Sequence, residues 1–137
     1  THAGLVAGAH AYSASFTPIG IAVEGGKDEM CRHGLELTRE TAKLIGLNTT
    51  FQPEDIHIDD GFFGEGYGIP TAEGLDAIRL LARTEAVVLD PVYSGKALAG
   101  LIAHVRAGEI GPDESVVFLH TGGGPSIFPF GEILLAG

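Results

Sequence analysis

The stretch from Leu89 to Gly100 most constrains what this chain can fold into. The apolar run 86–89 leads into it and predicts a buried parallel strand, because such strands are apolar along their whole length. Asp90-Pro91 ends that strand, since proline has no N–H for a β-ladder. Apolar residues then recur at helical spacing, which predicts a helix that begins near Ser94. Tyr93 and Ser94 therefore lie where a strand ends and a helix begins, and open α/β sheets bind ligands at such points.

A second stretch has the same form. Residues 115–119 predict another buried strand, which is followed by His120, Thr121 and the glycines 122–124. The carboxyl ends of parallel strands meet at one edge of a sheet. The two polar strand ends therefore predict a single site.

The rest of the chain alternates between strand and helix patterns. Strands are predicted at 18–23 and 56–60, and helices at 1–12, at 27–46 and after Thr71, which suits an N-cap. This alternation predicts an α/β fold with an open parallel sheet. Two polar groups receive a structural interpretation: Cys31 as a packing residue of its helix, and His57, Asp59 and Asp60 as a solvated edge rather than a metal site.

Composition limits the classes of function. A chain of 137 residues suits a small domain or part of a larger one, and its net charge of −10 argues against nucleic acids and anionic membranes as partners. A single cysteine excludes an internal disulfide and favours a reducing cytoplasm. Neither a membrane-spanning run nor a signal peptide is recognisable in the sequence.

Three segments together resemble a known family. "EGYGIPT" (65–71), "LDPVYSGKALAGL" (89–101) and "FLHTGG" (118–123) resemble the D-cysteine desulfhydrase and 1-aminocyclopropane-1-carboxylate (ACC) deaminase family. Members use pyridoxal phosphate (PLP) on the tryptophan-synthase-β-like fold, which is fold type II, with helices on both faces of the sheet. The resemblance extends from Thr1 to about Phe128. It does not show whether the residues after Phe128 belong to the natural protein.

The resemblance also implies how the chain relates to the whole enzyme. Residues 1–137 correspond to the C-terminal part of the large, PLP-binding domain. The family's Schiff-base lysine and small domain lie upstream of Thr1, and Thr1 itself follows a phosphate-binding turn. We therefore expect this chain alone to be inactive, and the full-length protein to be a homodimer.

The site residues follow from the same resemblance. Tyr67 and Tyr93 match tyrosines on the substrate side and are the catalytic candidates, with packing on the cofactor as the alternative. The candidates for cofactor binding are Thr1, Ser94, Thr121 and Gly122; no metal ligand is expected. A helix N-terminus at Thr1 would bind a phosphate well, although Thr1 could also be an ordinary N-cap.

Ser94 separates branches of the family. The deaminase branch has a glutamate there, which faces the pyridine nitrogen and keeps it protonated. A serine hydroxyl carries no charge and would leave that nitrogen largely neutral, which suits a good leaving group such as thiolate or sulfite. Thr121 is its expected companion at the same nitrogen, and the alternative for Ser94 is a simple helix N-cap.

Two further residues receive structural interpretations. Lys96 is expected to be structural or solvent-facing rather than the Schiff-base lysine, and His120 to be a satisfied buried histidine rather than a general base.

The expected activity is a PLP-dependent β-elimination that converts D-cysteine to pyruvate, sulfide and ammonia. L-Cysteate sulfo-lyase is the next alternative, followed by ACC deaminase. A non-catalytic α/β binding module is a third class, because the chain contains no expected Schiff-base lysine.

Overall fold

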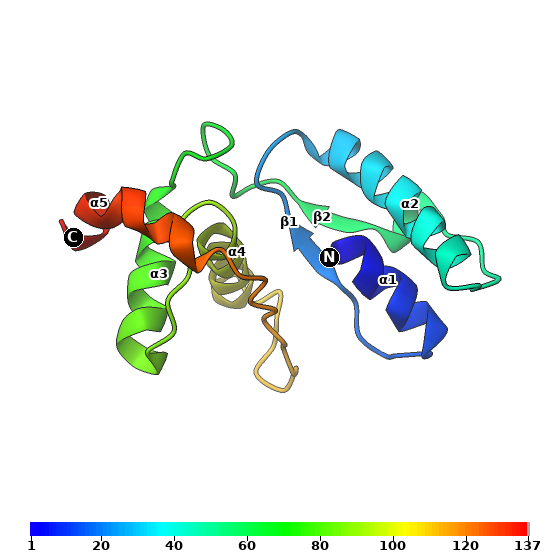
Figure 1. Ribbon diagram of the computed structural model, residues 1–137. Coiled ribbons are helices and arrows are strands. Elements are labelled where there is room, and N and C mark those ends of the chain that lie inside the picture. Colours follow the sequence, from blue (N-terminus) through cyan, green and yellow to red (C-terminus); the bar gives the residue numbers. More distant parts are fainter. Residues whose placement is uncertain (137) are drawn as a thin grey trace. The chain divides into compact units, whose positions relative to one another are not determined.

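The computed structural model describes residues 1–136, which divide into two compact units, 1–60 and the part from Gly61 onward (Figure 1). The units are described separately below. Within residues 1–136, every helix is too short or too polar to cross a lipid bilayer.

The first unit contains two helices and a parallel pair of strands. Its elements are α1 (His2–Ala11), β1 (Ile19–Ile21), α2 (Lys27–Leu44), a 3-10 helix (Pro53–Asp55) and β2 (His57–Asp59). β1 and β2 pair in parallel, with Ile19 opposite His57 and Ile21 opposite Asp59. Parallel neighbours need a crossover connection, and α2 lies within it. The predicted helices and the parallel arrangement are confirmed here.

The core of this unit lies where α1 and α2 pack together and where α2 meets β2. It is built from Val6, Ala7, Leu35, Ala42, Phe51 and Ile56. Cys31 packs against this cluster, as predicted. Gly46, one residue after the C-cap of α2, has a φ of +71°, a conformation in which glycine has no steric penalty.

The second unit is formed by helices and turns. Its elements are α3 (Ala72–Glu85), α4 (Ser94–Arg106), a 3-10 helix (Gly124–Phe130) and α5 (Gly131–Leu135). The Thr71 hydroxyl accepts a hydrogen bond from Gly74 N at 3.1 Å, which confirms the predicted N-cap of α3. The helices α3 and α4 pack closely at Gly95, where an added Cβ would lie only 2.8 Å from the Ile78 side chain.

The strands predicted at 86–89 and 115–119 are absent from the described part of the chain. Both segments lack a β-ladder, and Ala86 is instead the left-handed C-cap of α3. Val88 and Val117 are 48% and 90% exposed, although both were expected to be buried. An apolar run indicates a preference for burial, but a β-strand also needs a neighbouring strand that supplies backbone hydrogen bonds. In residues 1–136 no such neighbour pairs with either segment.

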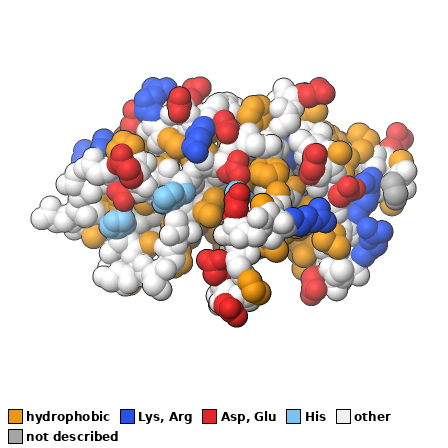
Figure 2. All heavy atoms as spheres, turned by 180° about the vertical axis from the view of Figure 1, so that it is seen from behind, with side chains coloured by type: hydrophobic (Ala, Val, Ile, Leu, Met, Phe, Trp, Pro, Cys, Tyr) orange, Lys and Arg blue, Asp and Glu red, His pale blue; other side chains and the backbone are white. Residues whose placement is uncertain are grey.

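Acidic side chains are spread over the face shown in Figure 2, where Lys and Arg side chains occur in small groups. This distribution agrees with the net charge of −10.

The first unit provides a test of its core. Phe51 is fully buried, and we expect Phe51→Ala to lower the free energy of unfolding by about 3–5 kcal/mol, because the substitution leaves a cavity. The control is Phe128→Ala, which removes an 82% exposed ring and should change this energy by less than about 0.5 kcal/mol. Denaturant titration of the purified proteins measures both, and equal effects would contradict the assigned core.

Candidate active site

The turn between α3 and α4 is built around the carboxylate of Asp90. This side chain is fully buried, and its Oδ2 accepts hydrogen bonds from the N–H groups of Val92 and Tyr93, each at 2.8 Å. Its Oδ1 accepts the Ser94 N–H at 2.9 Å. Asp90 thus satisfies backbone donors at the start of α4 that would otherwise be unpaired, and it places a negative charge at the positive end of the helix dipole.

Ser94 completes this turn. It is 2% exposed, its hydroxyl donates to Asp90 Oδ1 at 2.5 Å, and it accepts a hydrogen bond from Asp90 N at 2.9 Å. α4 begins at Ser94 as predicted, but the N-cap is Tyr93, so the alternative of Ser94 as N-cap is wrong. Capping at this helix comes from Asp90, four residues earlier. A hydroxyl has one donor and two acceptor positions, so Ser94 Oγ keeps one lone pair for a further partner.

The hydrogen bonds determine the charge of Asp90. Burial by itself raises the pKa of a carboxyl group, but the hydrogen bonds from Ser94, Tyr93 and Val92 outweigh it and lower the pKa of Asp90 below its usual value. The carboxylate is therefore ionised at neutral pH.

The two candidate catalytic tyrosines lie together. The hydroxyl groups of Tyr67 and Tyr93 share a hydrogen bond, and their rings meet edge to face with centroids 5.8 Å apart. Both side chains are partly open to solvent, at 53% and 44% exposure. A phenol can donate or accept a hydrogen bond without carrying charge near neutral pH, so this pair can hand a proton to a bound molecule.

The segment after residue 119 lies beside the Asp90 turn. His120 donates from Nε2 to the carbonyl of Val88 at 3.2 Å, and its Nδ1 accepts the N–H of Gly122 at 3.2 Å. A Cβ on Gly123 would lie only 2.7 Å from Asp90 Oδ1, so this position must be glycine. The predicted meeting of the two stretches is confirmed. It depends on turns and on His120, which is satisfied as expected but exposed rather than buried.

Thr121 and Gly122 are both exposed next to this contact. Gly122 has a φ of +108°, which an L side chain rarely adopts, and its missing Cβ leaves the backbone open to a close neighbour. The Thr121 hydroxyl is exposed and can contact a ligand, whereas the remaining lone pair of Ser94 Oγ is buried.

Thr1 lies in the first unit, at the N-cap of α1, and its hydroxyl makes no capping hydrogen bond there. The structure therefore does not use Thr1 as an ordinary side-chain cap. The first turn of α1 contains no acidic residue, so its N-terminus remains suited to an anion.

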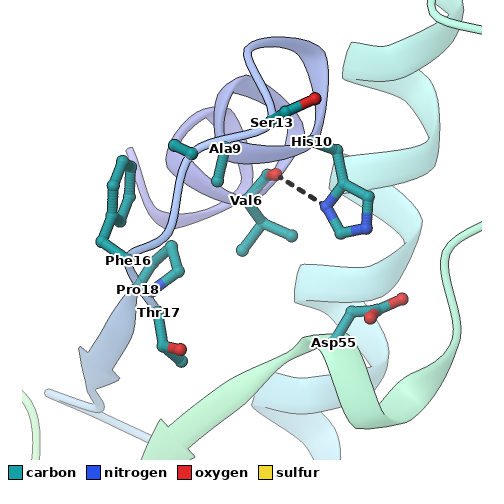
Figure 3. Close-up of a pocket in the computed structure, with 9 residues that line it drawn as sticks. Val6, Ala9, His10, Ser13, Phe16, Thr17, Pro18 and Asp55 are labelled. Atoms are coloured by element: carbon teal, nitrogen blue, oxygen red, sulfur yellow. Dashed lines mark hydrogen bonds between the residues drawn. The ribbon is translucent and has the colours of Figure 1, made fainter.

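A separate pocket of about 400 Å³ in the first unit contains none of the predicted site residues. Figure 3 shows Val6, His10, Ser13 and Asp55 among the residues around it, with His10 Nδ1 bonded to the carbonyl of Val6 at 3.4 Å. Within the described residues, no cluster of three or more His, Cys, Asp or Glu side chains could hold a metal ion.

Asp90 and Lys96, both in the second unit, have roles that the sequence did not reveal. Asp90 was identified only as the end of a strand, although an aspartate shortly before a predicted helix is a recognisable capping signal. Lys96 is fully buried, so the solvent-facing interpretation is wrong and the structural one holds. Its neighbours Gly95 and Ala97 are small, and this was the available sign of close packing.

Known proteins match nearly the whole chain. A family model described as "pyridoxal-phosphate dependent enzyme" matches residues 1–122. D-cysteine desulfhydrase of Salmonella paratyphi C is 38% identical over 130 residues, which is 95% of this chain and 39% of that protein. The protein of the same name from Salmonella typhi is also 38% identical, with the same coverage.

A solved structure agrees with these matches. The crystal structure of an ACC deaminase homologue superimposes with a TM-score of 0.86 at 35% identity, and the match covers 99% of this chain and 40% of that protein. The chain thus spans about two fifths of the length of its relatives. The predicted α/β fold of fold type II is confirmed by this match.

The ionised state of Asp90 provides a test of the turn. Its folded-state pKa is lowered, so its contribution to stability is present above the unfolded-state value of about 3.9 and is lost as the pH falls through the lower folded-state value. Asp90→Asn should lower the free energy of unfolding by about 1–3 kcal/mol at neutral pH, and the energy should then fall less steeply in acid.

The control for this test is Asp76→Asn, because the Asp76 side chain is 79% exposed and makes only a surface ion pair with Arg79. Denaturant titrations between about pH 2 and pH 7 cover the range in which Asp90 loses its charge. An Asp90→Asn protein with the wild-type acid dependence would show that this carboxylate does not stabilise the fold.

Proposed function

This chain belongs to the family of pyridoxal-phosphate-dependent enzymes, and from that premise we propose that it is the C-terminal part of a D-cysteine desulfhydrase. The reaction consumes D-cysteine and water and releases pyruvate, hydrogen sulfide and ammonia. The Cβ–S bond breaks, sulfur leaves with its electron pair, and water replaces the amino group. The curated relatives at 38% identity with this name support the choice.

The candidate cofactor-binding residues carry uncharged polar groups, and those of each unit suit a different part of the cofactor. When bound, PLP supplies the electron sink that allows a bond at the substrate's Cα to break. Thr1 and the N-terminus of α1 would hold its phosphate, because free backbone N–H groups and the helix dipole favour an anion. The Thr121 hydroxyl would donate to its pyridine nitrogen, and the Ser94 hydroxyl, which here donates to Asp90, would have to turn toward the ring to donate as well. Gly122 would allow the backbone to approach the ring, since it lacks a Cβ.

The observation that carries the proposal is the hydrogen bond between the Tyr67 and Tyr93 hydroxyl groups. In a pair of phenols one hydroxyl donates to the other, and the second hydroxyl can donate its own hydrogen to a third atom. The pair can thus protonate a departing sulfur or hold a substrate group without placing a charge near it. A binding module without chemistry would not need two half-exposed phenols in this arrangement.

Ser94 favours elimination of sulfur over cyclopropane ring opening. The position that is glutamate in the deaminase branch is a serine here, and its hydroxyl donates to Asp90. At this position the chain would offer the cofactor an uncharged hydroxyl rather than a carboxylate. A weaker electron sink is sufficient when the leaving group is a thiolate, and also when it is sulfite, which keeps L-cysteate as the second candidate substrate.

We place the whole enzyme in the cytoplasm as a homodimer, with its Schiff-base lysine and small domain upstream of Thr1. The relatives support a longer protein, because this chain matches about 39% of their length, whereas the upstream location follows from the resemblance.

A comparison of substrates tests the function. The whole protein, loaded with PLP, is assayed in parallel with D-cysteine, L-cysteine, L-cysteate and 1-aminocyclopropane-1-carboxylate. We expect pyruvate and sulfide from D-cysteine with the highest kcat/KM. Faster sulfite release from L-cysteate would move the assignment to a sulfo-lyase, and 2-oxobutanoate from the cyclopropane substrate would move it to the deaminase branch.

A substitution tests the role of the tyrosine pair. Tyr93→Phe removes a hydroxyl but keeps the ring, so we expect kcat to fall on the order of 10²-fold while PLP affinity changes little. The matched control is Tyr12→Phe, which changes an 87% exposed tyrosine of the first unit. Steady-state kinetics and a cofactor titration provide both readouts, and a wild-type kcat for Tyr93→Phe would reduce this residue to packing.

A further inference from the structure

Lys96 is a buried cation whose role the proposed reaction does not explain. It lies in the first turn of α4, yet its side chain is fully buried, and burial lowers the pKa of its ammonium group. Nζ donates hydrogen bonds to the carbonyls of Phe63 at 2.7 Å and Gly66 at 3.2 Å. Neither acceptor is a carboxylate. A charge buried in this way is costly, so its retention calls for a specific task.

Both carbonyls belong to the glycine-rich segment 61–70, called the glycine loop below. The described structure contains neither helix nor strand in this loop. Gly64 and Gly68 have φ values of +71° and +77°, a region in which glycine is unstrained. Such a segment has little rigidity of its own, and the position of its side chains must be determined by what it is attached to.

The Phe62 ring packs this loop against the core between α3 and α4, and two further contacts attach the part around Tyr67 to the start of α4. Lys96 holds the carbonyl of Gly66, the residue directly before Tyr67. Tyr93, three residues before Lys96, holds the hydroxyl of Tyr67. The backbone contact and the side-chain contact thus lie on either side of the Tyr67 Cα. Together they restrict the position of the Tyr67 backbone and the position of its hydroxyl group.

We propose that Lys96 is a positioning residue. It fixes the glycine loop on α4 and thereby maintains the hydrogen bond between the hydroxyl groups of Tyr67 and Tyr93. An ammonium group suits this task because its hydrogen bonds to carbonyls are charge-assisted and stronger than those of a neutral donor. One ammonium can also hold two carbonyls at once, which a backbone N–H would do poorly. The consequence for catalysis rests on the function proposed above, whereas the fixation of the loop does not.

Proteolysis tests the fixation without any measurement of activity. Chymotrypsin cleaves after aromatic residues and more slowly after leucine, and the glycine loop contains Phe62, Phe63 and Tyr67. In the PLP-loaded whole protein, Lys96→Met should be cleaved in this loop at least about tenfold faster than wild type, because two hydrogen bonds that oppose opening are lost. Lys43→Met, a change at an exposed lysine of α2, is the matched control and should leave the cleavage rate unchanged.

Mass spectrometry of the fragments separates local opening from unfolding. Leu98 is buried within α4, so cleavage after it reports loss of the helix. Loop cleavage without cleavage at Leu98 is the expected result. Should Lys96→Met fail to fold, Lys96→Gln, which keeps a shorter neutral donor, should give the same local increase. A wild-type loop cleavage rate in a folded variant of either kind would overturn the proposal.

A double substitution tests whether Lys96 acts through Tyr67. Tyr67→Phe should lower kcat/KM for D-cysteine on the order of 10²-fold, the range expected for loss of a proton donor. If Lys96 only positions this hydroxyl, Lys96→Met combined with Tyr67→Phe should lose no more than Tyr67→Phe alone. If the double variant instead loses kcat/KM by the product of the two single losses, Lys96 has a general structural role and the proposal is overturned.

The two tests separate the two claims. If D-cysteine is not the substrate, the activity test is repeated with the substrate that is found, and the proteolysis result stands by itself. Loss of the function assignment would therefore leave the role of Lys96 intact, and the reverse also holds.

Discussion

The buried carboxylate of Asp90 is the interaction on which the second unit depends. It binds the backbone N–H groups of Val92, Tyr93 and Ser94 together with the Ser94 hydroxyl, so one side chain determines how the chain enters α4. The carbonyl of Asp90 also accepts the N–H of Gly95 at 2.8 Å. Without this anion, several buried donors would have no partner, at a cost on the order of 1–3 kcal/mol each. The orientation of Tyr93 follows from the same bonds.

Asp90 and Lys96 bring two opposite charges into the start of one helix, and main-chain groups satisfy each of them. The carboxylate binds N–H groups, whereas the ammonium binds carbonyls of the glycine loop. Such an arrangement makes backbone geometry, rather than a salt bridge, the partner of each charge. Main-chain dipoles that are held in place in a buried site are preorganised, and they need not reorient when a ligand binds. This is a physical basis for holding the phenol of Tyr67, which lies between two glycines, beside that of Tyr93.

The sequence predicted elements whose signals are local, and it missed features that depend on partners. The helices α1, α2, α3 and α4 and the Thr71 cap follow from apolar periodicity and capping chemistry, and the parallel pairing of β1 with β2 follows from their helical crossover. The strands at 86–89 and 115–119 were wrong, because an apolar run cannot show whether a ladder partner is present. Burial of Lys96 was equally invisible, since its partners are carbonyls 30 and 33 positions away.

The candidate site shows the same division between local and distant signals. The proximity of residues 86–90 to 120–123 was expected from two parallel strands, and the structure achieves it by other means. His120 bridges the carbonyl of Val88 and the N–H of Gly122, and Gly123 packs directly against the Asp90 carboxylate. A histidine side chain here replaces part of what a β-ladder would provide, and a glycine makes the close approach possible. Turn chemistry is therefore sufficient to bring Thr121 and Gly122 beside the start of α4, although neither segment forms a strand.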